Sequence, residues 1–419
     1  MKLYHGDIVY TRGPEAFEIH ENAWIGVENG KVAGIYHQLP EAFRDLPVTD
    51  YGRGLIIPAF TDLHVHAPQY AMRGTKMDLL LSDWLATQTF PEEAKFHSRA
   101  YAEAVYTAFA DDLVKQGTLH AVVFGTIHRV ATGILMEELE KRNLSAYVGK
   151  VSMDRGAPGY LTEDTADSLA ETQRFLYDHQ GNGRVKPILT PRFAPTCSRE
   201  QLMGLGKLGQ TYGVGMQTHL VESRWEAAEA LRLFPECGSD AEIYEKAGLL
   251  ENGPVIFAHT IFPTPGDLAV IKRVGATTVH CPDATNNVIA GIMPAAALMG
   301  DGVRVTLGSD VGAGHGLAIY KQVARTVQLS KLKEFYEPEG NKSVPFHTAF
   351  YMATKASGEL FGRVGSFEEG YDFDALVIDG VEDGWQTMSP ADRLERFAYT
   401  GDDRNIIARF IRGKAVGEV

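Results

Sequence analysis

The chain has 419 residues, 44% hydrophobic and 22% charged, the composition of a globular protein with a sizeable core. The formal net charge of −14 argues against nucleic acid or an anionic membrane as a partner, and no apolar stretch predicts a membrane span. Three cysteines without a Cys-x-x-Cys pair, and a start without a signal-peptide pattern, lead us to expect a cytoplasmic protein.

Residues 1–57 are expected to form β structure. The runs 7–10 and 23–27 are rich in apolar and β-branched residues, and Asn29-Gly30 follows the second run. This dipeptide tolerates the positive φ angles of a type I′ turn, so it predicts a hairpin.

Residues 58–364 show strands that alternate with helices. Apolar strand candidates end near His66, Gly125, Asp154, Phe193, Glu222, Thr260, Pro282 and Asp310. Segments with apolar residues at helical spacing lie at 98–116, 130–143, 165–179, 198–212, 224–234, 265–274, 286–299 and 317–333. This succession predicts a parallel (β/α)8 TIM-like barrel, whose chemistry lies at the carboxyl ends of its strands.

Beyond the barrel, residues 346–361 are expected to form a helix, followed by β structure at 364–379 and 406–416. Two-stranded pieces are only marginally stable alone. We therefore expect residues 365–419 to pair with residues 1–57 in one small discontinuous β-sandwich domain. The predicted fold class is α/β.

Two histidines close the first strand candidate of the barrel. Residues two apart on a strand point to the same face, so His64 and His66 present their imidazoles side by side, as a divalent metal such as zinc requires. An isolated His-x-His is more often a pair of ordinary core or surface histidines. Here His219, His259 and Asp310 close three further strands, which favours a metal site assembled from four strands.

Three histidines and one carboxylate leave a coordination position for water, which is typical of a catalytic zinc site. Asp310 fits a ligand that also accepts a proton from the bound water, with a helix N-cap as the alternative. His259 fits a ligand, a donor that polarises the attacking water, or a hydrogen-bonded core histidine, and the sequence leaves these open. Cys281 is not part of a Pro-Cys-x-x-Cys motif, which excludes the zinc nucleobase deaminases that carry one.

Glu222 lies three residues after His219, an offset that puts the two on opposite faces of a continuous strand. Both reach one site only if the chain turns after His219. Glu222 is then the candidate general base, which takes a proton from the metal-bound water and returns it to the substrate. The alternative is a surface glutamate beside a core histidine.

Between the hairpin at 27–36 and residue 379, the chain resembles the amidohydrolase superfamily and, within it, the guanine deaminases. The segments that carry the resemblance are 64–70, 83–85 with 89–91, 190–197, the pair His219 and Glu222, 258–259, 280–282 and 308–312. The metal motifs are shared across many amidohydrolases. The neighbourhood of Gln69 and the run Pro191-Arg192-Phe193 are more selective.

The resemblance implies one zinc ion per chain, with iron as a possible substitute. The residues that it assigns to the metal are His64, His66, His219 and Asp310, with His259 close by. Those that it assigns to the purine are Gln69, Arg192, Phe193, His219 and Glu222, and Glu222 also shuttles the proton. Superfamily members with two ions carry a carboxylated lysine at the end of strand four, where this chain has Thr190-Pro191-Arg192. One departure is Ala284-Thr285, in the loop expected to rim the site, where guanine deaminases usually have Ser-Asn.

The implied reaction is the hydrolytic deamination of guanine to xanthine and ammonia, a step of purine catabolism. A small-molecule substrate and a second copy of the chain in a homodimer are the expected partners. The alternative substrate on the same scaffold is another aminated or halogenated N-heterocycle, such as a pterin, a triazine or another nucleobase. A non-catalytic assembly protein of the same fold should have lost ligands, and this chain retains all of them.

Overall fold

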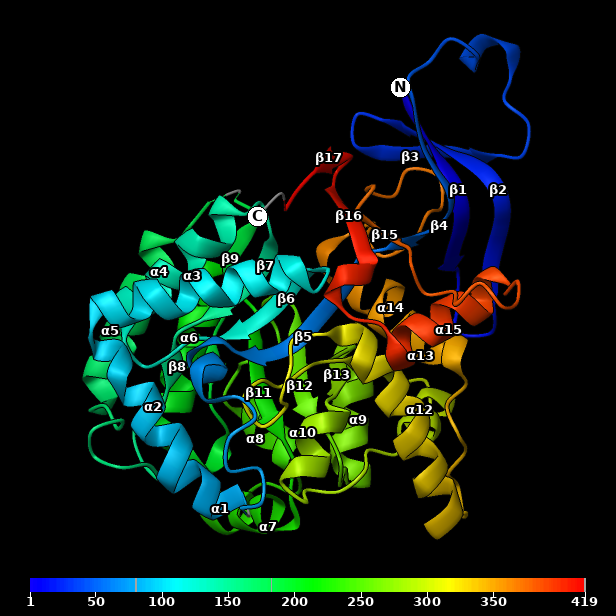
Figure 1. Ribbon diagram of the computed structural model, residues 1–419. Helices are drawn as coiled ribbons and strands as arrows, with labels where there is room; N and C mark the ends of the chain where they lie inside the picture. Colours follow the sequence, from blue (N-terminus) through cyan, green and yellow to red (C-terminus); the bar gives the residue numbers. More distant parts are fainter. Residues whose placement is uncertain (80, 182, 418–419) are drawn as a thin grey trace.

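The computed structural model describes residues 1–79, 81–181 and 183–417. The middle of the chain carries two four-stranded sheets, ordered β5-β6-β7-β9 and β11-β12-β13-β14 (Figure 1). Every strand pair within them is parallel. Their strands are β5 Phe60–His66, β6 Thr118–Phe124, β7 Ser145–Gly149, β9 Val185–Pro187, β11 Met216–Leu220, β12 Val255–His259, β13 Thr277–His280 and β14 Arg304–Leu307. The α/β class expected from the sequence is confirmed.

Backbone hydrogen bonds join these two sheets at both edges. Beside β9, the short strand β10 Thr190–Pro191 pairs in parallel with β8 Val151–Ser152. Just before β10, Leu189 O accepts a hydrogen bond of 2.9 Å from Gln217 N of β11. At the other edge, His64 O of β5 accepts one of 2.8 Å from Asp310 N, which follows β14. The carboxyl ends of the strands therefore lie at one end of a common parallel arrangement.

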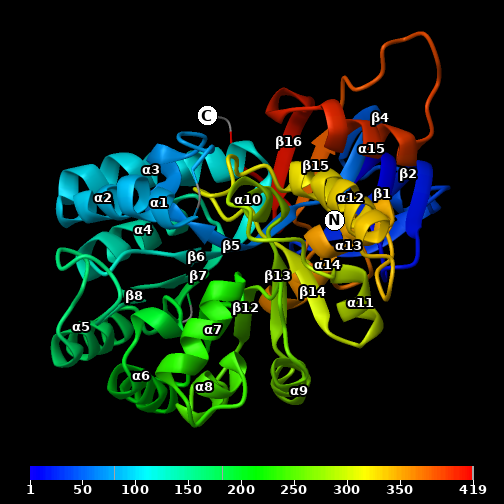
Figure 2. The ribbon, with the colours of Figure 1, turned by 90° about the horizontal axis from the view of Figure 1, so that it is seen from below.

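Helices cover the outside of the strands, as Figure 2 shows for α5, α6, α8 and α9. They include α3 Arg99–Lys115, α4 Arg129–Lys141, α5 Thr165–Asp178, α6 Arg199–Tyr212, α7 Arg224–Leu233, α8 Asp240–Lys246, α9 Pro265–Val274 and α12 Ile319–Tyr336. Several start where the sequence supplies a cap: the side chains of Ser98, Asp164, Ser198 and Thr264 accept hydrogen bonds from first-turn amides. Within the described residues, no helix is both long enough and apolar enough to cross a membrane.

Two helix predictions were wrong in detail. The segment 286–299 is not one helix but two short ones, α10 Pro282–Asn287 and α11 Ala295–Gly300. Gly291, at φ 134°, and Pro294, which lacks an N–H, separate them. Likewise 346–361 divides into α13 Phe346–Ala353, α14 Lys355–Gly358 and a 3₁₀ turn.

Some helices were not expected from the sequence. These are α1 Leu81–Trp84, α2 Phe90–Ala94, α8 and α15 Pro390–Thr400. With four and five residues, α1 and α2 are too short for a helical period to emerge.

Both ends of the chain share one seven-stranded sheet, in the order β17-β16-β15-β4-β1-β2-β3. Its strands are β1 Lys2–Thr11, β2 Phe17–Glu28, β3 Lys31–Tyr36, β4 Val48–Pro58, β15 Ala375–Ile378, β16 Ile406–Ile411 and β17 Lys414–Ala415. β15 lies antiparallel to β4, so the expected pairing of the two chain ends is present. Asn29 and Gly30 join β2 to β3 with φ angles of 52° and 79°, which confirms the predicted hairpin turn.

Candidate metal centre and adjoining cavity

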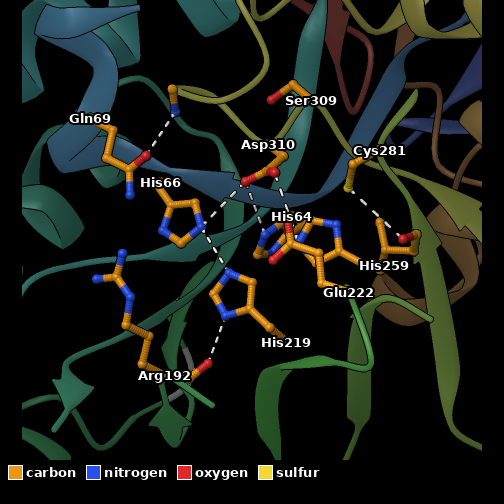
Figure 3. Close-up of polar contacts among 12 residues, drawn as sticks. His64, His66, Gln69, Arg192, His219, Glu222, His259, Cys281, Ser309 and Asp310 are labelled. Atoms are coloured by element: carbon orange, nitrogen blue, oxygen red, sulfur yellow. Dashed lines mark hydrogen bonds and ion pairs between the residues drawn. The ribbon is translucent and has the colours of Figure 1, made fainter. Parts of the chain in front are cut away.

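The structure brings together all five residues that the sequence predicts for a metal site (Figure 3). His64 and His66 lie on β5, His219 on β11, and His259 ends β12, while Asp310 follows β14. All five side chains are buried. Oδ1 of Asp310 lies 3.2 Å from His64 Nε2 and 3.3 Å from His66 Nε2, and His66 Nε2 lies 3.1 Å from His219 Nε2. Nitrogen and carboxylate atoms from four strands therefore converge on one point.

The backbone at this point adopts unusual angles. His259 and Asp310 have φ angles of 71° and 47°, in the left-handed region that non-glycine residues rarely occupy. Val221 has a φ angle of 44°, and this is the turn after His219 that allows Glu222 to reach the same site. Such conformations persist where the surroundings fix them, and they concentrate at functional sites.

Asp62, buried on β5, supports this geometry, although the sequence reading did not single it out. Its Oδ1 accepts hydrogen bonds from His64 N (3.1 Å) and Ser309 N (3.0 Å). Its Oδ2 accepts a third from Ser309 Oγ at 2.5 Å. The carboxylate thus ties β5 to the segment that carries Asp310.

The protonation states of the cluster suit a cation. Burial lowers the pKa of His66, takes that of His219 well below its ordinary value, and lowers that of His259 to about 3. Burial alone would raise the pKa of Asp310, but the nearby His64 and the other histidines hold it well below the usual range. The imidazoles of His66, His219 and His259 therefore favour the neutral form beside an ionised carboxylate, a donor set that fits zinc.

Unpaired atoms give a second indication. Within the described residues, His64 Nε2 and His259 Nε2 are buried without a hydrogen-bond partner, and both lie near the Asp310 carboxylate. Buried polar atoms are nearly always satisfied, so two such nitrogens beside one carboxylate fit a cation held among them. Nδ1 of His219 lies 2.6 Å from Arg192 O, which assigns the proton to Nδ1 and leaves Nε2 free to bind a metal.

Glu222 lies at the edge of the cluster. Its Oε2 is 3.8 Å from His259 Nε2, and its backbone N–H donates to Glu226 Oε2 at 2.9 Å. Burial, with the charge of Asp310 beside it, raises the pKa of Glu222 to about 8. A carboxyl group that exchanges its proton near neutral pH is suited to general acid–base work.

A cavity opens directly beside the cluster. The residues that line it include His66, Gln69, Trp84, Arg192, Phe193, His219, Glu222, Trp225, His259 and Asp310. In Figure 3, Gln69 and Arg192 lie on the side of His66 that is opposite to Cys281. The cavity therefore combines the metal-type residues, a carboxyl group and two side chains with several N–H donors.

Glu93 is a functional candidate that the sequence analysis missed. Its carboxylate, 2% exposed, accepts hydrogen bonds from Gln69 Nε2 and from Arg192 Nη1. The available signal was the acidic pair Glu92-Glu93 after Phe90-Pro91, next to a segment already noted. Nothing in that pair shows which carboxylate faces the site.

The expectation for Ala284 and Thr285 is wrong. Ala284 and Thr285, expected in a loop at the rim, are instead buried within α10 and are not among the residues that line the cavity. The lysine that most closely precedes Thr190-Pro191-Arg192 is Lys186, which lies exposed on β9 with its Nζ 6.0 Å from the ring centre of Tyr147. In the described ranges, the end of β10 therefore presents Arg192 to the cavity rather than a lysine.

Known proteins resemble this chain over almost its whole length. The model of the Amidohydrolase family matches residues 55–416. The guanine deaminase of Rattus norvegicus is 34% identical, with 99% of this chain and 96% of that protein covered. A crystal structure of guanine deaminase from C. acetobutylicum with bound guanine has a TM-score of 0.96 at 41% identity, and covers 99% of this chain and 100% of that one. The E. coli guanine deaminase structure has a TM-score of 0.89 at 28% identity, with both chains fully covered at 100%.

Proposed function

This chain belongs to the amidohydrolase family, and from that premise we propose that it is a metal-dependent aminohydrolase that converts guanine and water to xanthine and ammonia. The observation that carries the proposal is the cavity in which Arg192 and Gln69 face the histidine cluster and Glu222. Similarity to guanine deaminases along the whole chain supports it.

Guanine suits this cavity by its pattern of acceptors. The guanidinium of Arg192 remains charged near neutral pH and donates to the C6 carbonyl oxygen. The amide of Gln69 hydrogen-bonds a ring nitrogen, and Phe193 packs beside the bound ring. These contacts hold C2, which carries the amine, over the histidine cluster.

Proton transfer is the task of Glu222, Asp310 and His259. As water adds to C2, Glu222 takes one of its protons and delivers it to the ring nitrogen next to C2. Asp310 accepts the second proton, and His259, 3.8 Å from both carboxylates, polarises the water and the developing negative charge. This second proton passes to the amine, and the C2 carbonyl of xanthine forms as the amine departs as ammonia.

The residues that hold the metal in this proposal are His64, His66, His219 and Asp310. When bound, a zinc ion (or an iron ion in its place) lowers the pKa of a water molecule towards neutrality, which supplies the nucleophile. A second ion would need a bridging ligand at the end of strand four, where Arg192 stands instead.

We predict one tightly bound divalent ion per chain, most of it zinc. Elemental analysis of the purified protein should give one equivalent, and His66→Ala should bind much less because the variant loses one of four ligands. Two equivalents per chain, or full activity in a strong chelator, would contradict the assignment.

The architecture that we propose is a (β/α)8 barrel over residues 58–364, with residues 1–57 and 365–419 in a small β-sandwich. Residues 418–419 of that range lie outside the described residues. The hydrogen bonds that join the two parallel sheets at both edges support the barrel. The sandwich is supported by Phe373, which links the two edges of the seven-stranded sheet. Its N–H donates to Gly30 O in the turn between β2 and β3, and its carbonyl accepts from Gly413 N in the turn between β16 and β17. Tyr4 and Phe373 stack in the core that this encloses. The placement of the site at strand ends then follows the rule for such barrels.

A cytoplasmic location and a homodimer complete the proposal. The three cysteines are all free and buried, as expected in a reducing compartment. The homodimer remains a prediction that the molar mass in solution measures directly.

The test of the proposed function is ammonia release from guanine, adenine, cytosine, a pterin and a triazine under identical conditions. We expect guanine to give the highest kcat/KM. Adenine should be poor, because it has no amine at C2 and no carbonyl oxygen at C6. If a pterin or triazine is turned over faster than guanine, the chain is an aminohydrolase of that heterocycle. If no substrate releases ammonia, the aminohydrolase assignment fails.

A further inference from the structure

Glu93 binds two separate groups of the proposed purine site at once. On α2, its Oε1 accepts from Gln69 Nε2 at 2.8 Å and from Arg192 Nη1 at 3.0 Å, and its Oε2 accepts from the same Nη1 at 2.8 Å. Glu93 and Gln69 are each 2% exposed, and Arg192 is 5% exposed. This carboxylate lies behind the cavity, and the substrate does not need to touch it.

The pair of Glu93 with Arg192 settles where the guanidinium points. An unpaired buried charge is unfavourable, and among the described residues Glu93 is the acidic side chain that forms an ion pair with Arg192. Because both carboxylate oxygens hold the Nη1 end, the remaining N–H groups of the guanidinium are left for a ligand.

The same carboxylate also settles which way the Gln69 amide faces. An ionised carboxylate only accepts hydrogen bonds, so the amide nitrogen must point at Glu93. The amide oxygen is then placed to accept from Gly312 N at 3.2 Å. One N–H of Gln69 remains unassigned by these contacts and is available to an acceptor.

We propose that Glu93 is a positioning residue. It turns the N–H donors of Arg192 and Gln69 towards the cavity, so that the cavity selects rings with an acceptor oxygen at C6. The inference rests on the proposed function for the identity of the ring, and it assigns the selectivity of Arg192 and Gln69 to a third side chain. Without the carboxylate, the guanidinium loses its fixed direction and the amide can turn over.

The test compares Glu93→Gln with Glu92→Gln. Glu92 is a matched control because it is the neighbouring buried carboxylate of α2, yet it pairs with Lys95 and Tyr101. Two unreactive ligands report the selectivity: hypoxanthine has the C6 oxygen, purine lacks it, and neither has an amine at C2. Their dissociation constants are measured by calorimetry, with metal content and melting temperature recorded for each variant.

In the unaltered protein, hypoxanthine should bind at least about tenfold more tightly than purine, the usual scale for a hydrogen bond to a charged donor. Glu93→Gln should weaken the binding of hypoxanthine by about 10–100-fold and leave the binding of purine nearly unchanged, so the ratio of the two dissociation constants becomes smaller. Glu92→Gln should keep the ratio. Glu93→Asp, which retains the charge at a shorter reach, should restore part of it.

The proposal is overturned if Glu93→Gln weakens both ligands by the same factor, which is what a purely structural role predicts. It is also overturned if the unaltered protein does not distinguish the two ligands. Should Glu93→Gln fail to fold, the ratio of the two dissociation constants is measured in Glu93→Asp instead. A smaller ratio than in the unaltered protein then supports the proposal, and an unchanged ratio overturns it. Because these ligands are not deaminated, the outcome is separate from guanine turnover, whose absence would count against the proposed function alone.

Discussion

Glu222→Gln is expected to keep the fold and the bound metal and to lose about 10²–10⁴-fold in kcat, the usual contribution of a positioned acid–base group. The amide fills the same volume and can still accept the contacts of the carboxyl group, but it cannot take up a proton from water. Burial raises the pKa of Glu222 to about 8, so the carboxyl group that the amide replaces can exchange its proton near neutral pH. Steady-state kinetics with guanine, together with elemental analysis, measures the effect.

Glu229→Gln is the control for this prediction. Glu229 lies on α7, close to Glu222 in the sequence. Its carboxylate pairs with Arg232 at 2.7 Å, and the residue does not line the cavity. Its variant should turn over guanine at the rate of the unaltered protein. A Glu222→Gln variant with near-normal kcat would remove Glu222 from the mechanism and leave the proton transfer to Asp310 and His259.

The positions of the candidate metal ligands were predictable because each depends on a local rule. His64 and His66 are two apart on a strand, and His259 ends an apolar run, so strand periodicity and the barrel rule bring them to one edge. The family resemblance is confirmed by the match of the family model and by relatives along the whole chain. Strand periodicity and the barrel rule both apply without knowledge of contacts between distant parts of the sequence.

Glu93 and Asp62 could not be found in this way. The bond of Glu93 to Arg192 joins residues 99 positions apart, and α2 shows no period that separates Glu93 from Glu92. Asp62 contacts Ser309 across 247 positions. Which carboxylate becomes buried depends on how the segments dock, and composition and periodicity do not contain that information.

The break at 286–299 has a different cause. Apolar residues at helical spacing predicted one helix, and the segment does bury an apolar face. Gly291 and Pro294 were visible in the sequence, but a single proline or glycine is compatible with a kinked helix as well as with two helices. The local signal was therefore present and insufficient.

Arg192→Ala should lower kcat/KM for guanine on the order of 10³-fold, because it removes the donor to the C6 oxygen and leaves the Glu93 carboxylate buried without its partner. Metal content should not change, since the main-chain carbonyl that holds Nδ1 of His219 is retained in alanine. The loss should be much smaller for 2-aminopurine, which keeps the C2 amine and has no oxygen at C6. Kinetics with both substrates therefore separates lost recognition from general damage.

Arg199→Ala serves as the control, because Arg199 is exposed and pairs with Glu236 at 2.5 Å, away from the cavity. It should leave both substrates unaffected. If Arg192→Ala instead turns over guanine normally, the arginine is only a structural partner of Glu93, and the C6 oxygen must be read by another group. If both substrates fall by the same large factor, Arg192 supports the shape of the cavity without selecting guanine. The assignment of guanine thus depends on the difference between the two substrates, while the assignment of a metal hydrolase depends on the histidine cluster alone.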